Sequence, residues 1–122
     1  MPVSYSLNSE LLQLTAAGQY EPMDIPRQLV AALDDPACPS SVALLLDVRE
    51  SGVLSDRTSA QIRDVSVFLE PYAERIGRRC AVVASRDVHF ELARMGAVFC
   101  EDVGVEANVF RTMEEAVEWL NP

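Results

Sequence analysis

Apolar residues along this chain fall into short runs that alternate with longer amphipathic stretches. Residues 42–48 are apolar except for Asp47, and residues 79–85 contain the run AVVAS. Such continuous runs are typical of parallel strands that are covered on both faces. In residues 105–109 apolar and polar side chains alternate, which predicts a half-exposed edge strand.

Two further short strands are predicted near the N-terminus, over residues 3–6 and 11–16. Asn8 and Ser9 between them favour a turn, so the two strands are expected to form a hairpin.

Four amphipathic stretches carry apolar residues at helical spacing. They cover approximately residues 24–34, 58–76, 87–99 and 112–120. Asp24, Asp87 and Thr112 are expected to act as N-caps, and Glu115 stands at the capping-box distance from Thr112. Pro71 is expected to kink or split the second of these helices, because proline lacks the N–H that a helix interior needs.

The predicted element order is therefore β-β-α-β-α-β-α-β-α. Strands that alternate with helices imply parallel pairing through right-handed crossovers, and the first strand is expected to be the antiparallel exception. The 122 residues, 49% of them hydrophobic, suit one domain. We predict a single domain over residues 1–122, of the α/β class, with a mixed, mostly parallel sheet of about five strands and four helices.

The charge of the chain narrows the classes of partner. The net charge is −9, and all ten basic residues are arginine. An acidic surface repels nucleic acid and anionic membranes, so neither is expected as a partner. The chain contains no run of about 18 apolar residues, as a membrane span requires, and no leader pattern at its start, so a cytoplasmic location is expected.

Catalytic or metal-binding residue sets are not evident in the sequence. Cys38, Cys80 and Cys100 are odd in number and irregularly spaced, which is not typical of disulfide or zinc frameworks. His89 is the only histidine and is expected at the surface or at the rim of the core, in the first turn of its helix. Cys100 is eleven residues along the same helix, roughly 16 Å away, so the two side chains do not form a dyad. We predict a protein that is not an enzyme and needs neither cofactor nor metal.

The segment after the central strand is the first candidate site. Ligands of open α/β sheets collect at the carboxyl ends of strands. Arg49, Arg57 and Arg86 all lie near such ends and, with Asp47 and Ser51, predict a site for an anion or a partner. In the alternative interpretation, the arginines pair with acidic neighbours and Asp47 binds N–H groups of the loop.

A second candidate site is apolar. Residues 90–100, FELARMGAVFC, are apolar on more than one face of the predicted helix. Phe90 and Met95, together with Phe68 and Tyr72, could line a site for a lipid-like ligand or form an interface. Deeper burial is the alternative, and Trp119 is expected either at the rim of the core or in the contact of a homodimer.

The C-terminal stretch LARMGAVFCEDVGVEANVFRTMEEAVEWL resembles the STAS, or anti-sigma-factor-antagonist, fold. The resemblance depends on a helix containing glycine (94–96), a last strand (109–110) and a helix of the type T-x-E-E-A (112–120). The tail is most similar to the uncharacterised STAS-like proteins.

This resemblance implies a regulatory or interaction domain with a protein partner. Antagonists of this family carry a D-S-S-G loop in which a partner kinase phosphorylates a serine, and the matching residues here read Asp56-Arg57-Thr58-Ser59. Arg57 and Ser59 depart from that motif, and Thr58 and Ser59 are the candidate phosphorylation sites. The alternative function, suggested by lipid-carrying proteins of related fold, is a carrier or sensor for a small apolar ligand between sheet and helices.

Overall fold

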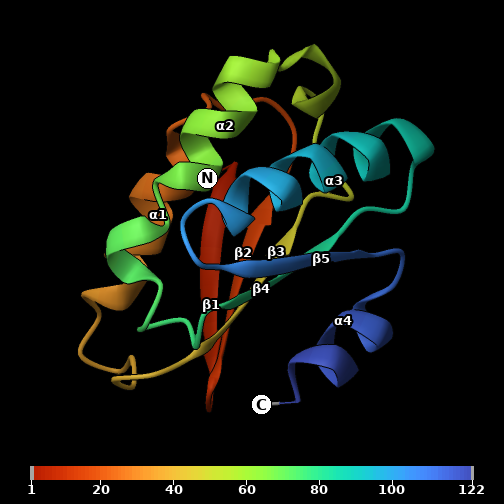
Figure 1. Ribbon diagram of the computed structural model, residues 1–122. Helices are drawn as coiled ribbons and strands as arrows, with labels where there is room; N and C mark the ends of the chain where they lie inside the picture. The colour runs from red at the N-terminus through yellow and green to blue at the C-terminus, as the bar shows by residue number, and fades with distance from the viewer. Residues whose placement is uncertain (1, 122) are drawn as a thin grey trace.

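A computed structural model describes residues 2–121 as one sheet with helices on both of its faces (Figure 1). The strands are β1 (Val3–Asn8), β2 (Leu11–Ala16), β3 (Ala43–Asp47), β4 (Arg79–Val83) and β5 (Glu106–Phe110). The α-helices are α1 (Asp24–Leu33), α2 (Ser59–Val67), α3 (Asp87–Glu101) and α4 (Met113–Leu120), and two short 3-10 helices are η1 (Leu54–Asp56) and η2 (Glu70–Tyr72).

The sheet follows the order of the sequence, β1-β2-β3-β4-β5. Only β1 and β2 pair antiparallel, and the other three pairings are parallel. The predicted α/β class, with one mixed sheet of five strands and four helices, is confirmed. The predicted antiparallel hairpin and the edge position of the last strand are also confirmed.

Successive side chains of the central strands face different helices. Leu44 and Cys80 belong to the apolar cluster on the side of α1, whereas their neighbours Leu45 and Ala81 pack against α4. Helix α1 lies over β1 and β2, α3 lies over β5, and α4 covers β3, β4 and β5 from the opposite face. The continuous apolar runs of β3 and β4 therefore reflect helices on both sides.

Helix α2 is placed differently from the other three, because it packs mainly on α3 rather than on a strand. Gly96 of α3 allows this approach: a Cβ at this position would lie 3.2 Å from the Ser66 Oγ of α2. The helices over the sheet thus leave part of its centre open. Leu46 and Val82, which pair in register on β3 and β4, are only half-buried.

The long helix predicted over residues 58–76 is divided in the structure. Helix α2 ends at Val67, and η2 and a series of turns continue to β4. Pro71 in η2 accounts for the break, because it has no N–H to donate and restricts the residue before it.

Two predicted N-caps were wrong by one residue. Helices α1 and α3 begin at Asp24 and Asp87 themselves, and neither has a side-chain cap. The Asp24 carboxylate instead accepts a hydrogen bond from the backbone of Glu21. The Asp87 carboxylate pairs with Arg111 at 2.7 Å. The Asp24 partner is three residues away and the Asp87 partner is 24 residues away, and neither is a backbone N–H of the helix that the carboxylate was expected to cap.

The cap predicted at Thr112 is confirmed, since its hydroxyl oxygen accepts from the backbone N–H of Glu115. The hairpin turn lies at Ser9-Glu10, one residue later than predicted, because the pairing extends to Asn8 and Leu11.

The two faces of β3 are expected to differ in their contribution to stability. Leu45 is 0% exposed, and Leu45→Ala should lower the free energy of unfolding by about 3 kcal/mol. Leu46→Ala should cost about 1 kcal/mol, because the Leu46 side chain lies beside open space and leaves little new cavity. Denaturant unfolding of both variants measures the difference. Equal losses would contradict the incomplete cover of this strand.

Candidate functional site

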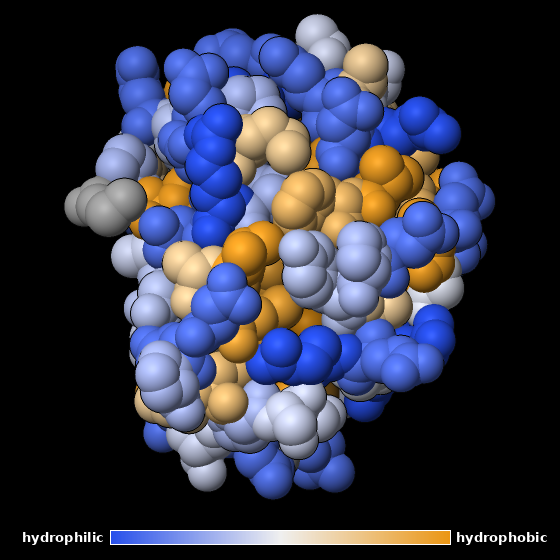
Figure 2. Space-filling view, turned by 90° about the vertical axis from the view of Figure 1, so that its left-hand side faces the viewer, coloured by the Kyte–Doolittle hydropathy of each residue, from blue (hydrophilic) through white to orange (hydrophobic). Residues whose placement is uncertain are grey.

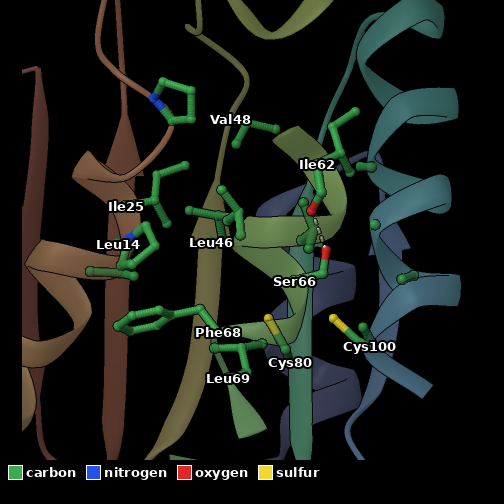
Figure 3. Close-up of a pocket in the computed structure, with 18 of the residues that line it drawn as sticks. Leu14, Ile25, Leu46, Val48, Ile62, Ser66, Phe68, Leu69, Cys80 and Cys100 are labelled. Atoms are coloured by element: carbon green, nitrogen blue, oxygen red, sulfur yellow. Dashed lines mark hydrogen bonds between the residues drawn. The ribbon is translucent and has the colours of Figure 1, made fainter. Parts of the chain in front are cut away.

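A cavity of about 120 Å³ lies between the sheet and the three helices on its α1 side. Strands β2, β3 and β4 form its floor, and residues of α1, α2 and α3 form its walls and roof (Figure 3). On the side of the molecule that carries α1 and α2, apolar side chains gather at the centre of the surface and hydrophilic ones surround them (Figure 2).

The lining is almost entirely apolar. Its members share aliphatic or aromatic character and include Leu14, Ile25, Leu46, Val48, Ile62, Val65, Phe68, Leu69, Val82 and Leu92. Ser66 also faces this space, but its hydroxyl donates to the carbonyl of Ile62 at 2.8 Å and so needs no partner there. Small residues of α3, among them Ala93 and Ala97, leave room that larger side chains would fill.

Two cysteines lie at one end of the cavity, near Phe68 and Leu69 (Figure 3). Burial raises the pKa of the Cys80 thiol far above its ordinary value and that of Cys100 to about 11. Both thiols are therefore protonated at neutral pH and weakly nucleophilic. At this end the cavity offers packing surface rather than reactive groups.

Besides Ser66, the lining includes the polar residues Tyr20, Arg57 and Gln61. The Tyr20 hydroxyl and the Ser51 Oγ are hydrogen-bonded at 2.8 Å, and Arg57 Nη2 donates to the Tyr20 carbonyl. The guanidinium carbon also lies 5.2 Å from the centre of the Tyr20 ring. Burial raises the pKa of Tyr20, so its phenol stays neutral.

The loop that follows β3 is joined to the loop that follows β2. Gly52 N donates to the Gly18 carbonyl at 2.8 Å, and Gly18 N donates to the carbonyl of Glu50 at 2.9 Å. A Cβ on Gly52 would lie 3.2 Å from the Gly18 oxygen, which explains why a glycine fits here. Ser51 is buried and its Oγ accepts from Leu54 N at 3.1 Å, so this hydroxyl organises the loop.

The residues predicted to bind an anion are placed in separate local arrangements. The Asp47 carboxylate accepts from both the backbone and the guanidinium of Arg49, and this hydrogen bond raises the pKa of Arg49. Ser51 and Arg57 are bound to Tyr20, and Arg86 is exposed before the first residue of α3. Between residues 2 and 121, no hydrogen-bond or ion-pair partner is shared by any two of these three arginines. Of these five predicted residues, Arg57 lines the cavity.

The two candidate phosphorylation sites, Thr58 and Ser59, are exposed where α2 begins. Thr58 Oγ1 accepts from Gln61 N at 3.1 Å, and Gln61 Oε1 accepts from Thr58 N at 2.9 Å. This is a complete capping box, and the sequence T-S-A-Q carries its signature.

The four predicted apolar candidates do not share one site. Phe68 lines the cavity, and Tyr72 stacks on it with ring centres 5.7 Å apart. Phe90 lies under the guanidinium of Arg111, 4.3 Å from its carbon, and Met95 is 37% exposed.

The cavity residues that sequence reasoning missed include Tyr20, Leu46 and Ala93. Nothing in their spacing separates them from core positions. The one sequence feature that could have indicated the cavity is the presence of small residues, Ala93, Gly96 and Ala97, along one face of α3.

The surface position predicted for His89 was wrong, because its side chain is 4% exposed. Its buried Nδ1 has no hydrogen-bond partner within residues 2–121. Burial, followed by the charge of Arg86, lowers the pKa of the imidazole. His89 belongs to α3, a helix that also borders the cavity, but His89 is not one of the residues that line the cavity.

Comparisons with protein-family models, with curated proteins and with solved structures give no match to this chain. No helix among residues 2–121 combines the length and the apolar character that crossing a bilayer requires. Among the same residues, no set of three or more His, Cys, Asp or Glu side chains is placed to hold a metal ion. Function is therefore inferred from the cavity and its lining.

His89 should make the stability of the fold depend on pH. Because its pKa is lower in the folded chain than the ordinary 6.5, the unfolded chain binds this proton more readily. Relative to His89→Gln, the free energy of unfolding should be highest above about pH 6.5 and decrease as the pH falls through the folded-state pKa. An NMR titration of the single histidine gives that pKa directly, and a value above 6.5 would contradict the prediction.

Proposed function

We propose that this chain is a binding domain for a small apolar molecule, which occupies the cavity beneath α2. The observation that carries the proposal is the position of this space over the middle of the sheet. Leu46 and Val82, in adjacent central strands, form a half-buried apolar floor, and among residues 2–121 none of α1, α2 and α3 packs closely on β3 or β4. Burying such a floor is a main source of stability in folds of this kind.

The free-energy cost of an empty cavity supports an occupant. Protein interiors are normally packed without voids of this size. At roughly 24 cal/mol per Å³, an enclosed void of about 120 Å³ corresponds to about 3 kcal/mol of forgone stability. That is a large share of the 5–15 kcal/mol that typically separates folded from unfolded chains. A bound apolar molecule would recover much of it.

The chemistry of the lining supports binding rather than catalysis. The thiols at one end have raised pKa values, and the Ser66 hydroxyl is engaged with the backbone. A dry apolar cavity of about 150 Å³ accepts a molecule the size of benzene. The enclosed part of this cavity therefore suits a compact group of about six carbon atoms.

Ala93→Leu should fill the cavity from α3, and Ala31→Leu, on the exposed face of α1, is the matched control. Native mass spectrometry of freshly purified protein is expected to show a bound small molecule in the wild type and in the control, and a reduced bound fraction in Ala93→Leu. The same filling should leave the free energy of unfolding unchanged or raise it by about 1 kcal/mol.

Two results would count against this proposal. Overpacking a site with no free space typically destabilises by 1–3 kcal/mol, so a loss of that size in Ala93→Leu would mean that the cavity is closed. Apo masses for all three proteins, together with no binding of added apolar molecules, would remove the proposed function.

A second candidate function is a phosphorylation-controlled interaction domain of the STAS-like type. The exposed hydroxyls of Thr58 and Ser59 at the beginning of α2 favour it, because a partner kinase can reach them. A phosphate there would add about −1.5 to −2 charges beside Arg57 and would change the cap of α2. Since α2 packs mainly on α3, this change would alter one outer helix without disturbing the sheet.

Incubation with ATP and cell lysate, followed by mass spectrometry, tests this second function. Phosphate is expected within residues 58–59 of the wild type and should disappear in the double variant Thr58→Ala, Ser59→Ala. Ser55→Ala, an exposed serine of the same segment, should leave it unchanged. Modification confined to other residues, or none at all, would contradict a switch at this position.

A further inference from the structure

We infer that the apolar molecule carries a carboxylate, which Arg57 binds at the Tyr20 end of the cavity. This inference rests on the proposed binding function and adds the chemical class of the ligand. It depends on Arg57, which is the charged residue among the described residues of a mostly apolar lining.

Arg57 is held in place but is not neutralised. Its Nη2 donates to the Tyr20 carbonyl, and its guanidinium lies over the Tyr20 ring. Among residues 2–121, five other arginines form ion pairs with carboxylates, whereas Arg57 forms none. A guanidinium has five N–H donors, so most of them remain available for a ligand. A fixed side chain also loses less conformational freedom when it binds.

Gln61 adds to the excess of donors at this end. Its Oε1 accepts from Thr58 N in the capping box, which leaves the amide NH₂ without a partner in the described hydrogen bonds. The Tyr20 hydroxyl is already engaged with Ser51. The polar end of the cavity thus offers N–H groups and one positive charge, and it is complementary to an anionic oxygen group.

The amount of charge favours a carboxylate over a phosphate ester. One guanidinium balances the single charge of a carboxylate and can bind both of its oxygens in a fork. A phosphomonoester carries about −1.5 to −2 charges, and the remainder would face a protein of net charge −9. A single negative charge is the better match.

The cavity gives the ligand a direction. Arg57 precedes α2 and packs with Tyr20, whereas Phe68 and Leu69 follow the same helix and lie near Cys80 (Figure 3). Nine residues of helix span roughly 14 Å. The carboxylate would lie at the Arg57 end and the apolar part would extend toward Phe68, with about six carbons enclosed.

Heptanoate and 1-heptanol form a matched pair of probes, since each joins an apolar chain of six or seven carbons to a charged or a neutral head. NMR titrations of ¹⁵N-labelled protein at pH 7.5 give both dissociation constants. The wild type should bind heptanoate at least about tenfold more tightly than heptanol, as expected for a charge-assisted hydrogen bond. Arg57→Met should abolish this preference and leave the affinity for heptanol within about twofold.

Arg63→Met is the control, because Arg63 is exposed on α2, has no ion pair among residues 2–121 and lies outside the cavity lining. It should retain the full preference for heptanoate. Arg57→Lys, which keeps the charge but not the fork, should retain part of it and serves if Arg57→Met fails to fold.

The possible failures of the two proposals are distinguishable. Equal binding of heptanoate and heptanol by the wild type would overturn the carboxylate inference and leave apolar binding in place. An equal loss of preference in Arg57→Met and Arg63→Met would also overturn it. If neither probe binds the wild type, the cavity has no such ligand and both proposals fail.

Discussion

The close approach of α2 to α3 determines what this fold can hold. Gly96 presents no side chain toward Ser66, where a Cβ would come within 3.2 Å of the serine oxygen. Because α2 rests against its neighbouring helix, it covers the sheet at a distance instead of packing into it. The incomplete cover of Leu46 and Val82, the cavity and the position of Arg57 all depend on this helix contact.

The loop pairing at the opposite end of α2 completes the enclosure. Gly18 and Gly52 bring two loops together through backbone hydrogen bonds, and Ser51 joins them to Tyr20. Arg57 is thereby fixed against Tyr20 by contacts that do not use most of its donors. The polar end of the cavity is therefore held by these hydrogen bonds, whereas α2, which forms part of the apolar wall, packs on α3 rather than on the strands beneath.

The sequence predicted the fold well because strands and helices of this chain differ in hydrophobic period. The runs at 42–48 and 79–85 identify the central strands, and the cap at Thr112 locates the beginning of α4. The site was less predictable. Ile62 and Leu92 have the same spacing as core residues, and only three-dimensional packing decides that they border open space.

His89 shows a related limit, because a polar residue in a first helical turn is usually exposed. Its burial is a consequence of the packing around α3, which no local pattern records. Arg57 could be predicted as part of the loop after β3, yet its association with Tyr20 joins residues 37 positions apart. Sequence spacing gives no information on such a pair.

The order of strands in the sheet also has a consequence for synthesis. Each strand pairs with the one that precedes it in the chain, so every new strand meets a partner that has already left the ribosome. The floor of the cavity, β2 to β4, and the helix α2 above it are complete before α3 emerges. During translation this floor is therefore covered by α1 and α2 alone until residues 87–101 arrive, and α3 is the last helical wall of the binding space to be made.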